Sequence, residues 1–372
     1  MKYIRLIVRC AAFGRPTVQK GNAPMTEKEN YLRAVRFERP DYIPMTFHVN
    51  AACYDAYPQD ALFELMETHP LLFPDFRKPP LPFKPAYDLV ARKDAPYRDD
   101  FGCVWTTTCD DITGTVTGHP LADWEAFRTY RLPDPDRCTG IGPIDWDALK
   151  QQIAATPEAL HVGGLRHGHT FLQLCDLRGY ENLLYDMMDE EPLLDELIEG
   201  LTQFNLSIVA HYLDCGVDVM GYAEDLGMQV GPMLSPAAFR RYIQPAYRRL
   251  IRPAREKGVI IHMHSDGDIR LLVDDILDSG VQILNLQDLV NGIDWIKARF
   301  AGRICIDLDI DRQRVTRFGT PADIDRLIRQ EVAALGSRAG GLTMIFGLYP
   351  GTPLQNVKAL MDAMERYMGY YD

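Results

Sequence analysis

The feature that most constrains the fold is an apolar run that ends abruptly in polar residues. Residues 259–264 read Val-Ile-Ile-His-Met-His, and residues 265–268 continue as Ser-Asp-Gly-Asp. A short run rich in β-branched residues favours a buried strand of a parallel sheet. Parallel α/β barrels present their active-site side chains at the C-terminal ends of such strands. The pattern therefore predicts an enzyme with functional groups at this strand end.

The same pattern recurs along the chain and predicts a parallel sheet. Seven strands are expected, at residues 43–48, 161–166, 217–223, 259–264, 281–286, 303–308 and 341–346. From residue 160 onward they alternate with helices, as in βα units. We expect a single (β/α)8 TIM-type barrel. Its eighth strand should lie in the proline-rich residues 50–150, an irregular region expected to contain a β-hairpin and to cap the barrel mouth.

Helix boundaries are marked by capping signals. Thr320 and Thr352 each precede a proline and lie three residues before Asp323 and Gln355, so both predict capped helix starts with a proline at the first helical position. Apolar residues at helical spacing predict a long helix over residues 192–214, with its apolar stripe in the core.

Composition and charge limit the class of protein. The 372 residues are 47% hydrophobic and 25% charged, which is typical of a globular domain. The net charge of −12 argues against nucleic acid, and no segment approaches the ~20 apolar residues of a membrane helix. Eight cysteines without a CxxC pair indicate reduced thiols in a cytoplasm. We expect residues 1–24 to be a poorly ordered extension and residues 25–372 to form the barrel domain.

The strand end at residue 264 supplies the first candidate site. His264 and Asp266 are two residues apart on an extended strand, so both point to one side and can hold one cation or one substrate group. Alternatively, His264 bonds to backbone and the aspartate caps the next helix. Asp268 is better placed for that cap, because a helix is expected from Ile269. We therefore expect His264 and Asp266 to be catalytic.

A second pair of acids follows the strand at 217–223. Glu224 and Asp225 are adjacent, so they should point to opposite faces. Asp225 is expected to be a general acid or base, or a metal ligand. Alternatively, it is a solvated turn charge or the partner of an arginine.

Other strand ends predict residues that bind substrate. Histidines end three of the expected strands, which raises the possibility of a metal site. An arginine after the strand at 161–166 could clamp a carboxylate or phosphate. The residues expected to bind substrate are His48, Arg166, His167, Tyr222, Gln229, Asn285, Asp307 and Tyr349.

The order of several motifs resembles the uroporphyrinogen decarboxylase superfamily. These are Leu177-Arg-Gly-Tyr, Gly216-Val-Asp, Glu224-Asp225-Leu-Gly227, His264-Ser-Asp-Gly-Asp, Phe318-Gly-Thr-Pro, Gly340-Gly341 and Asn356-Val-Lys. The resemblance covers roughly residues 26–370. It implies a barrel with its active site at the C-terminal mouth of the strands, and either tetrapyrrole decarboxylation or zinc- and corrinoid-linked methyl transfer.

The chain departs from both patterns. The decarboxylases carry an arginine-rich segment after the first strand, whereas residues 46–50 here read Thr-Phe-His-Val-Asn, so uroporphyrinogen itself is not the expected substrate. The methyltransferases bind zinc through a His-x-Cys pair and a distant Cys. This chain keeps His264 but has Asp266 and Phe346 at or near the cysteine positions. An oxygen and nitrogen site from His264, Asp266 and Glu224 would suit zinc or a harder divalent metal.

The resemblance and the residues together favour a cytoplasmic enzyme, monomeric or homodimeric. We expect it to move a methyl group from a small O- or N-methylated compound to a corrinoid on a partner protein, with Asp225 managing a proton. Two alternatives stay open, a decarboxylase of a smaller carboxylated compound and a non-catalytic barrel that binds a ligand. The number of ionisable strand ends argues against the last, since burying charges without partners is costly.

Overall fold

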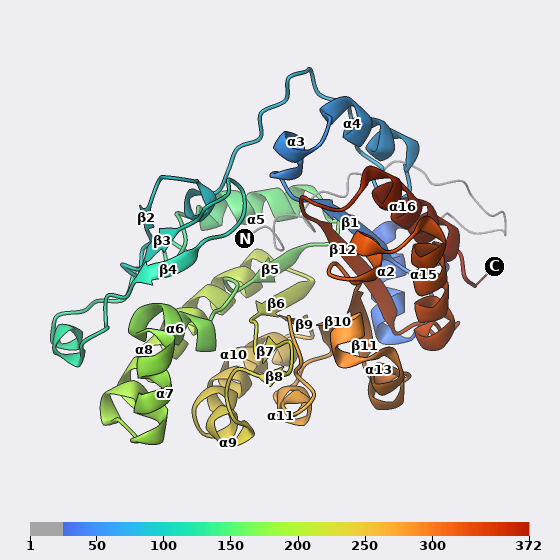
Figure 1. Cartoon of the computed structure of the whole chain (residues 1–372). Helices are drawn as coiled ribbons and strands as arrows, with labels where there is room; N and C mark the ends of the chain where they lie inside the picture. The colour runs from blue at the N-terminus through green and yellow to red at the C-terminus, as the bar shows by residue number, and fades with distance from the viewer. Residues whose placement is uncertain (1–24, 372) are drawn as a thin grey trace. The chain divides into compact units, whose positions relative to one another are not determined.

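The computed structural model describes residues 25–371, which divide into two compact units. One unit comprises residues 88–282, and the other comprises residues 25–87 together with residues 283–371. In Figure 1 the first unit runs from teal to yellow, and the second combines the blue start of the described chain with its orange and red end. The extension expected over residues 1–24 lies outside the described residues.

The first unit is built on three parallel strands. β5 (Val162–Gly164), β6 (Val219–Ala223) and β9 (Ile260–Ser265) pair in that order, with Ala223 beside His264. Because the strands are parallel, the segments that follow them all leave the same edge of the sheet. The unit's helices are α5 (Trp146–Ala155), α6 (Phe171–Arg178), α7 (Tyr180–Met188), α8 (Pro192–Cys215), α9 (Pro236–Ala238), α10 (Gln244–Glu256) and α11 (Val273–Asp278), with shorter turns at η1 (Leu89–Ala91), η2 (Trp124–Arg128) and η3 (Phe239–Ile243).

Helix α8 confirms the long helix predicted from apolar spacing. It begins with Pro192 at its first position and ends at Cys215, followed by Gly216, whose φ of 86° only glycine adopts without strain. The stripe that includes Leu194, Leu201 and Ile208 is buried. This stripe is therefore core, and α8 packs beside α10 and on β5.

The stretch in which the eighth strand was expected does not supply it. Within residues 88–150 the described strands are β2 (Tyr97–Arg98), β3 (Val104–Thr106) and β4 (Thr115–Gly118), which form a separate antiparallel sheet. The expected hairpin is confirmed as β3 and β4. Prolines and the positive φ of Gly102 interrupt this segment, so only short strands form.

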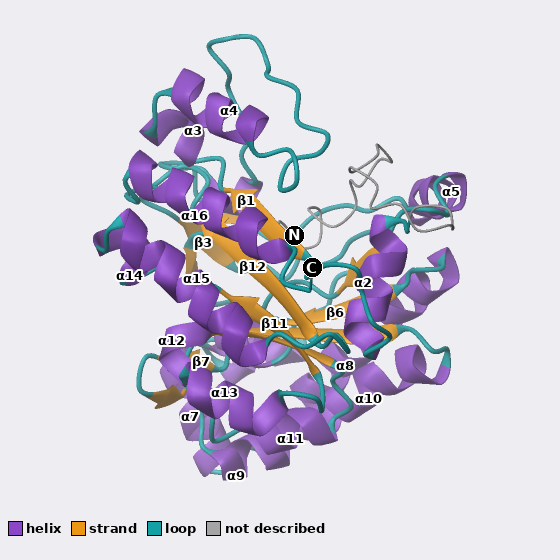
Figure 2. Ribbon diagram, turned by 90° about the vertical axis from the view of Figure 1, so that its right-hand side faces the viewer, coloured by secondary structure: helices purple, strands orange, loops and turns teal. Residues whose placement is uncertain are grey.

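The second unit is built on four parallel strands. β1 (Met45–Val49), β12 (Leu342–Leu348), β11 (Cys305–Asp309) and β10 (Ile283–Gln287) pair in that order. Figure 2 shows α15 and α16 side by side next to these strands. The unit's helices are α2 (Glu27–Arg36), α3 (Cys53–Ala56), α4 (Gln59–Thr68), α12 (Asp288–Asn291), α13 (Ile293–Phe300), α14 (Val315–Phe318), α15 (Pro321–Leu335) and α16 (Leu354–Met368).

One predicted capping box is confirmed and the other is wrong. Thr320 accepts the N–H of Asp323, whose carboxylate accepts the N–H of Thr320 in return. Helix α16 instead starts one residue later than expected, after Pro353, without a side-chain cap. The carbonyl of Thr352 accepts the hydroxyl of Tyr57 at 2.8 Å, so its backbone is held by a contact from outside the helix.

The α/β class and all seven expected strands are confirmed. The described residues contain three parallel strands in one unit and four in the other, so the expectation of eight strands around a closed barrel is not met in this part of the chain. The seven cysteines described are free thiols. Within residues 25–371, none of the helices combines the length and apolar character that crossing a membrane requires.

Candidate active site

Three strand ends of the first unit bring two histidines and an aspartate together. His167 follows β5, Asp225 follows β6 and His264 lies in β9. Oδ1 of Asp225 is 3.3 Å from Nε2 of His167 and 3.3 Å from Nε2 of His264. The side chain of His264 is 4% exposed, and those of Asp225 and His167 are 28% and 33% exposed. Solvent therefore reaches the cluster from the side of His167.

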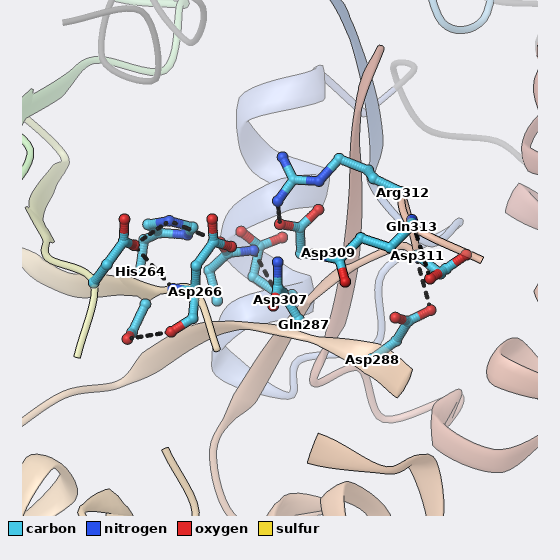
Figure 3. A network of polar contacts seen from close by, with 12 residues as sticks. His264, Asp266, Gln287, Asp288, Asp307, Asp309, Asp311, Arg312 and Gln313 are labelled. Carbon is cyan, nitrogen blue, oxygen red and sulfur yellow. Dashed lines mark hydrogen bonds and ion pairs between the residues drawn. The ribbon is translucent and has the colours of Figure 1, made fainter. Parts of the chain in front are cut away.

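Asp266 lies at the edge of this cluster. Its Oδ1 is 3.9 Å from Nε2 of His264, and its side chain is 37% exposed. Figure 3 shows the side chains of His264 and Asp266 close together at the end of β9. The structure thus brings together the three residues expected to be catalytic, Asp225, His264 and Asp266, and adds His167.

Backbone hydrogen bonds between neighbouring loops position the cluster. The N–H of Gly168 donates to the carbonyl of Ala223 at 2.8 Å, which fixes the loop of His167 on β6. The N–H of Glu224 donates to the carbonyl of His264 at 2.9 Å. The N–H of Asp266 donates to Oδ1 of Asp225 at 3.0 Å. The three strand ends that carry these side chains are therefore tied to one another, and the carboxylate of Asp225 is held directly.

Two glycines lock the loops after β6 and β9 against each other. A Cβ added at Gly227 would lie 2.6 Å from the carbonyl carbon of Gly267, and Gly267 has a φ of 81°. The N–H of Asp268 donates to the carbonyl of Met228 at 2.7 Å. Neither glycine can carry a side chain without moving backbone, so the contact depends on both. Asp268 also accepts the N–H of Arg270, whereas α11 begins only at Val273.

The histidines keep Asp225 ionised. Burial alone would raise the pKa of this carboxyl, but the charges and hydrogen bonds of His167 and His264 outweigh it and hold the pKa well below its usual range. Asp225 is therefore a carboxylate at any physiological pH. It can balance positive charge on its neighbours but has no proton to donate.

Glu224 points away from the cluster, as adjacent residues at a strand end should. It is fully buried, and its Oε1 accepts the N–H groups of Thr170 and Leu172 at 2.9 and 3.0 Å. Its Oε2 accepts the hydroxyl of Tyr247. Burial raises its pKa to about 7, against the lowering effect of these hydrogen bonds. Oε1 thus holds the start of α6 and Oε2 holds Tyr247 of α10, so both oxygens of Glu224 are engaged outside the histidine cluster.

Three residues expected to bind substrate lie outside the histidine cluster, two in the interior of the unit and one in an exposed turn. Arg166 is buried and pairs with Gln173 and with Asp176, the latter at 2.9 Å. Tyr222 is buried and its hydroxyl donates to the carbonyl of Leu250 in α10 at 2.8 Å. Gln229 is exposed in the turn between β7 (Gly227–Met228) and β8 (Gly231–Pro232). The first two positions are internal, so neither side chain is placed to clamp a substrate in this structure.

The histidine next in sequence to the cluster is a core residue. Nδ1 of His169 lies 2.7 Å from Oγ1 of Thr170. Burial, helped by the charges of His167 and Arg166, lowers its pKa to about 3. Its Nε2 has no hydrogen-bond partner within residues 25–371. His169 is therefore neutral and contributes packing rather than a charge.

The remaining expected residues belong to the second unit. Nδ2 of Asn285 donates to the carbonyl of Asp307 at 2.8 Å, and the carboxylate of Asp307 accepts the hydroxyl of Thr343 at 2.7 Å. Burial lowers the pKa of His48 to about 4, although the charge of Asp307 opposes this. These polar side chains lie on neighbouring parallel strands, β1, β10, β11 and β12.

The second unit also holds an ion pair that the sequence reasoning missed. Nη2 of Arg312 lies 2.7 Å from Oδ2 of Asp309, and both side chains are largely buried. The guanidinium of Arg312 lies 5.8 Å from the ring centroid of Tyr349. Figure 3 shows this pair, in which Asp309 is the last residue of β11. The sequence signal that could have predicted this ion pair is an aspartate three residues before an arginine, directly after a predicted strand.

A third group in the second unit consists of acids. Oδ2 of Asp288 accepts the N–H of Asp311 at 2.9 Å, as drawn in Figure 3. Glu331, from α15, is fully buried beside them. Burial raises the pKa of Asp288 to about 6. Burial and the nearby charges of Asp288 and Asp311 raise the pKa of Glu331 well above its usual range. Glu331 is therefore a neutral acid that can donate a proton to Asp288.

A large surface groove of the first unit does not coincide with the histidine cluster. It has a volume of about 690 Å³ and lies between α7, β8 and η3. Its lining is mainly apolar and includes Met187, Met233 and Leu271. No member of the histidine cluster lines it.

The histidine cluster has the donor atoms and the spacing of a metal site. Within residues 25–371, it is the one group of three His, Cys, Asp or Glu side chains whose ligand atoms all lie within 4.8 Å of one another. Imidazole nitrogen and carboxylate oxygen are ligands for zinc and other divalent first-row metals. The residues present therefore fit a divalent metal bound by nitrogen and oxygen, without thiolate.

Comparison with known proteins identifies the family. Residues 106–367, more than half of the chain, match the uroporphyrinogen decarboxylase (URO-D) family. The chain belongs to this family. The superfamily resemblance seen in the motif order is thereby confirmed.

Curated relatives of the chain have two different activities by name. A methylcobamide:CoM methyltransferase from Methanosarcina barkeri is 23% identical over 217 residues, which are 57% of this chain and 59% of the relative. A uroporphyrinogen decarboxylase from Thermus thermophilus is 26% identical over 180 residues, which are 48% of this chain and 50% of the relative. The matched part of the chain spans about half to three fifths of these relatives.

A solved structure has a fold similar to that of this chain. A methyltransferase from Methanosarcina mazei superposes with a TM-score of 0.61 at 18% sequence identity, covering 94% of this chain and all of the other. At this identity the likeness concerns the fold alone.

Proposed function

We propose that the chain is a methyltransferase that moves a methyl group from a small O- or N-methylated compound to the corrinoid of a partner protein. The observation that carries the proposal is the grouping of His167, Asp225 and His264 at three strand ends of a URO-D family chain. The Methanosarcina barkeri relative is by its name a methylcobamide:CoM methyltransferase. This relationship supports methyl chemistry at such a site.

The proposed transfer makes one demand on the protein. The bond between the substrate heteroatom and the methyl carbon breaks, and its electron pair stays on the heteroatom, which takes up a proton. The electron pair of the partner's reduced cobalt forms the new bond to the methyl carbon. An alkoxide or an amine departs poorly without an acid or a Lewis acid beside it. The site must therefore stabilise the departing heteroatom.

The cluster contains residues suited to this task. His264, 4% exposed, would form the side of the site that is shielded from water, while the more exposed His167 would lie where the site opens to solvent. Asp225 would act as a permanent carboxylate that balances charge on both imidazoles, because its pKa is held well below the usual range. This role replaces the expectation that Asp225 itself manages the proton. A divalent metal bound by these side chains would supply Lewis acidity to the heteroatom.

Decarboxylation of a smaller carboxylated compound is the second candidate. The Thermus thermophilus relative supports it, and a permanent carboxylate at position 225 would stabilise a cationic intermediate. Uroporphyrinogen itself is not the substrate we propose, because residues 46–50 contain no arginine to neutralise its carboxylates.

A methyl-transfer assay with a reduced corrinoid acceptor tests the proposal. A panel of methylated amines and aryl ethers should include a substrate that the purified chain demethylates, and uroporphyrinogen should remain unchanged. The His264→Ala variant should lower kcat/KM by at least about 100-fold. Thermal stability should change little, because a polar residue at a strand end contributes little to packing. Robust porphyrin decarboxylation, or full methyl transfer by His264→Ala, would overturn the proposal.

A further inference from the structure

We infer that His167, Asp225 and His264 bind one divalent transition-metal ion, and that its open coordination position accepts a hydroxyl or ether oxygen rather than a thiol. The ligand set stands on the geometry alone. The substrate class rests on the proposed function. Asp266 would lie beside the ion as an additional oxygen that orients a bound water or substrate.

The distances agree with a tetrahedral site. Two ligand atoms that each lie 2.0–2.1 Å from a tetrahedral ion are about 3.3–3.4 Å apart. Oδ1 of Asp225 lies 3.3 Å from Nε2 of both His167 and His264. A charge-assisted N–H to carboxylate hydrogen bond is typically shorter, about 2.7–2.9 Å. The two separations therefore match neighbouring ligands of one ion better than a tight ion pair.

The remaining separation, between the ligand nitrogens of His167 and His264, can shorten without rearranging the fold. The ligand atoms of the three residues all lie within 4.8 Å of one another. His264 is held in a strand and is almost fully buried, whereas His167 lies in a loop and is one third exposed. A small rotation of the His167 ring can therefore bring its Nε2 to the tetrahedral distance from His264. The exposed side of His167 is also where an open coordination position would meet solvent.

The surroundings hold the proposed ligands before an ion arrives. The N–H of Asp266 donates to Oδ1 of Asp225 at 3.0 Å. The N–H of Leu226 donates to Oγ of Ser265 at 3.0 Å, which ties the loop after Asp225 to the strand of His264. Hydrogen bonds that orient ligands in this way contribute strongly to metal affinity.

The donor set determines the class of substrate. Two neutral imidazoles and one carboxylate leave a divalent ion with a net charge of +1, whereas thiolate ligands would neutralise more of its charge. Nitrogen and oxygen ligands also suit harder metals and harder substrate atoms than thiolates do. None of the seven described cysteines belongs to the group. An ion held in this way would activate an oxygen leaving group most effectively.

Metal titration of the full chain tests the ligand set without any assay of activity. The protein is stripped with a chelator and titrated with Co²⁺, with the visible absorption of the bound ion as the readout, and then with Zn²⁺ in competition. The wild-type chain should bind one equivalent with a tetrahedral Co²⁺ spectrum. His167→Ala, Asp225→Asn and His264→Ala should each weaken binding by at least about 100-fold.

His211→Ala is the matched control. Nε2 of His211 lies 2.7 Å from Oδ1 of Asp136 in the same unit, so this pair has a histidine and a carboxylate but lies outside the three-residue group. Its loss should leave Co²⁺ binding unchanged. Thermal melting of each variant establishes that it is folded. Failure of the wild type to bind Co²⁺ or Zn²⁺, or wild-type affinity in the folded His167→Ala or Asp225→Asn protein, would overturn the inference.

The assays separate this inference from the proposed function. Metal binding without methyl transfer would leave the ligand set standing and remove the function. Methyl transfer at full rate in chelated protein would leave the function standing and overturn the metal site. With both in place, O-methyl compounds should be used at least about 100-fold more efficiently than methyl thioethers of similar shape. Equal use of the sulfur compounds would overturn the substrate class.

Discussion

Asp225 and Asp288 occupy matching places in the two units and have opposite properties. Each follows a parallel strand, β6 in the first unit and β10 in the second. Asp225 lies between two imidazoles, which hold its pKa well below the usual range. Asp288 lies beside Glu331 and Asp311 in a buried site, and its pKa rises to about 6. The same residue at the same kind of strand end is thus a permanent charge in one unit and a proton-sharing acid in the other.

This difference teaches that position along a strand predicts where a carboxyl lies but not what it does. Neighbouring groups contributed by other elements decide the charge. His167 comes from the loop after β5, and Glu331 comes from α15. A carboxylate held beside histidines is suited to bind cations, whereas an acid pair that shares a proton mainly holds backbone in place. We therefore assign chemistry to the first group and structure to the second.

The largest expected effect comes from neutralising each aspartate in turn. Asp225→Asn should lower methyl transfer at least about 100-fold, because the amide cannot balance charge on the two imidazoles or bind a metal well. Asp288→Asn should leave kcat/KM within about threefold, since the amide oxygen can still accept the N–H of Asp311. Steady-state kinetics of both variants against one substrate measures the contrast. Equal losses would remove the distinction between the two sites.

The next effect concerns the backbone that supports the first site. Gly267→Ala should reduce the free energy of unfolding by about 2–3 kcal/mol, because the added Cβ meets the backbone of Gly227 and the φ of 81° is strained for alanine. Gly216→Ala serves as the control, since it also has a positive φ but a Cβ there meets nothing within 4 Å. Urea unfolding should show the larger loss at Gly267. A similar loss in both variants would show that φ alone matters and that the loop contact does not.

The acid pair of the second unit should make stability depend on pH. The pKa values of Asp288 and Glu331 are raised from 3.8 and 4.5, so the folded state holds protons that the unfolded state releases. The stabilisation is complete below about pH 4 and is lost as pH rises through about 6 and beyond. In the Glu331→Gln variant, the drop in the free energy of unfolding between pH 5 and pH 8 should be smaller than in the wild type, by on the order of 2 kcal/mol.

Urea unfolding of the wild type and of Glu331→Gln at pH 5 and at pH 8 measures how the free energy of unfolding depends on pH. Asp225 adds no pH dependence to the free energy of unfolding between pH 5 and pH 8, because its stabilising charge is lost only as pH falls through a pKa well below 3.8. An identical slope in the wild type and in Glu331→Gln would show that the acids of the second unit do not share a proton.

The smallest expected effect compares helix starts. Thr320→Ala removes a reciprocal capping box from α15 and should cost about 1 kcal/mol of unfolding free energy. Ser235→Ala removes a single hydrogen bond to the N–H of Ala238, ahead of a helix of three residues, and should cost less. Chemical denaturation of the two variants distinguishes them. A larger loss at Ser235 would reverse the ranking of these two caps.

Local patterns were sufficient to predict the elements of the fold. Apolar runs predicted all seven parallel strands, because a buried strand needs few residues and each run ends at a clear polar boundary. The eighth strand could not be placed, since residues 88–150 form a small antiparallel sheet whose short strands have no strong periodicity. The start of α16 was misplaced because this helix begins without a side-chain cap, and the backbone of Thr352 is held by Tyr57, which is distant in sequence.

Part of the candidate site could be located from the sequence, again because local patterns were sufficient for some of its residues. His264, Asp266 and Asp225 could be found because each stands at the end of a recognisable strand. His167 was expected to bind substrate, but its distance from Asp225 follows from the pairing of β5 with β6, which one sequence does not display. The internal roles of Glu224 and Arg166 depend on burial and on partners such as Tyr247. Tertiary contacts of this kind leave no periodic signal.

The contact between Gly227 and Gly267 restricts how this protein can diverge. Strand-end loops are usually where enzymes of this architecture acquire new specificities, because insertions there disturb little. In this chain two of those loops touch through their backbones, so a side chain gained by one glycine requires a compensating change in the other loop. The tip of the hairpin between them is free of this coupling, with Val230 92% exposed. Descendants with new specificity should therefore vary at the hairpin tip while the two glycines change together or not at all.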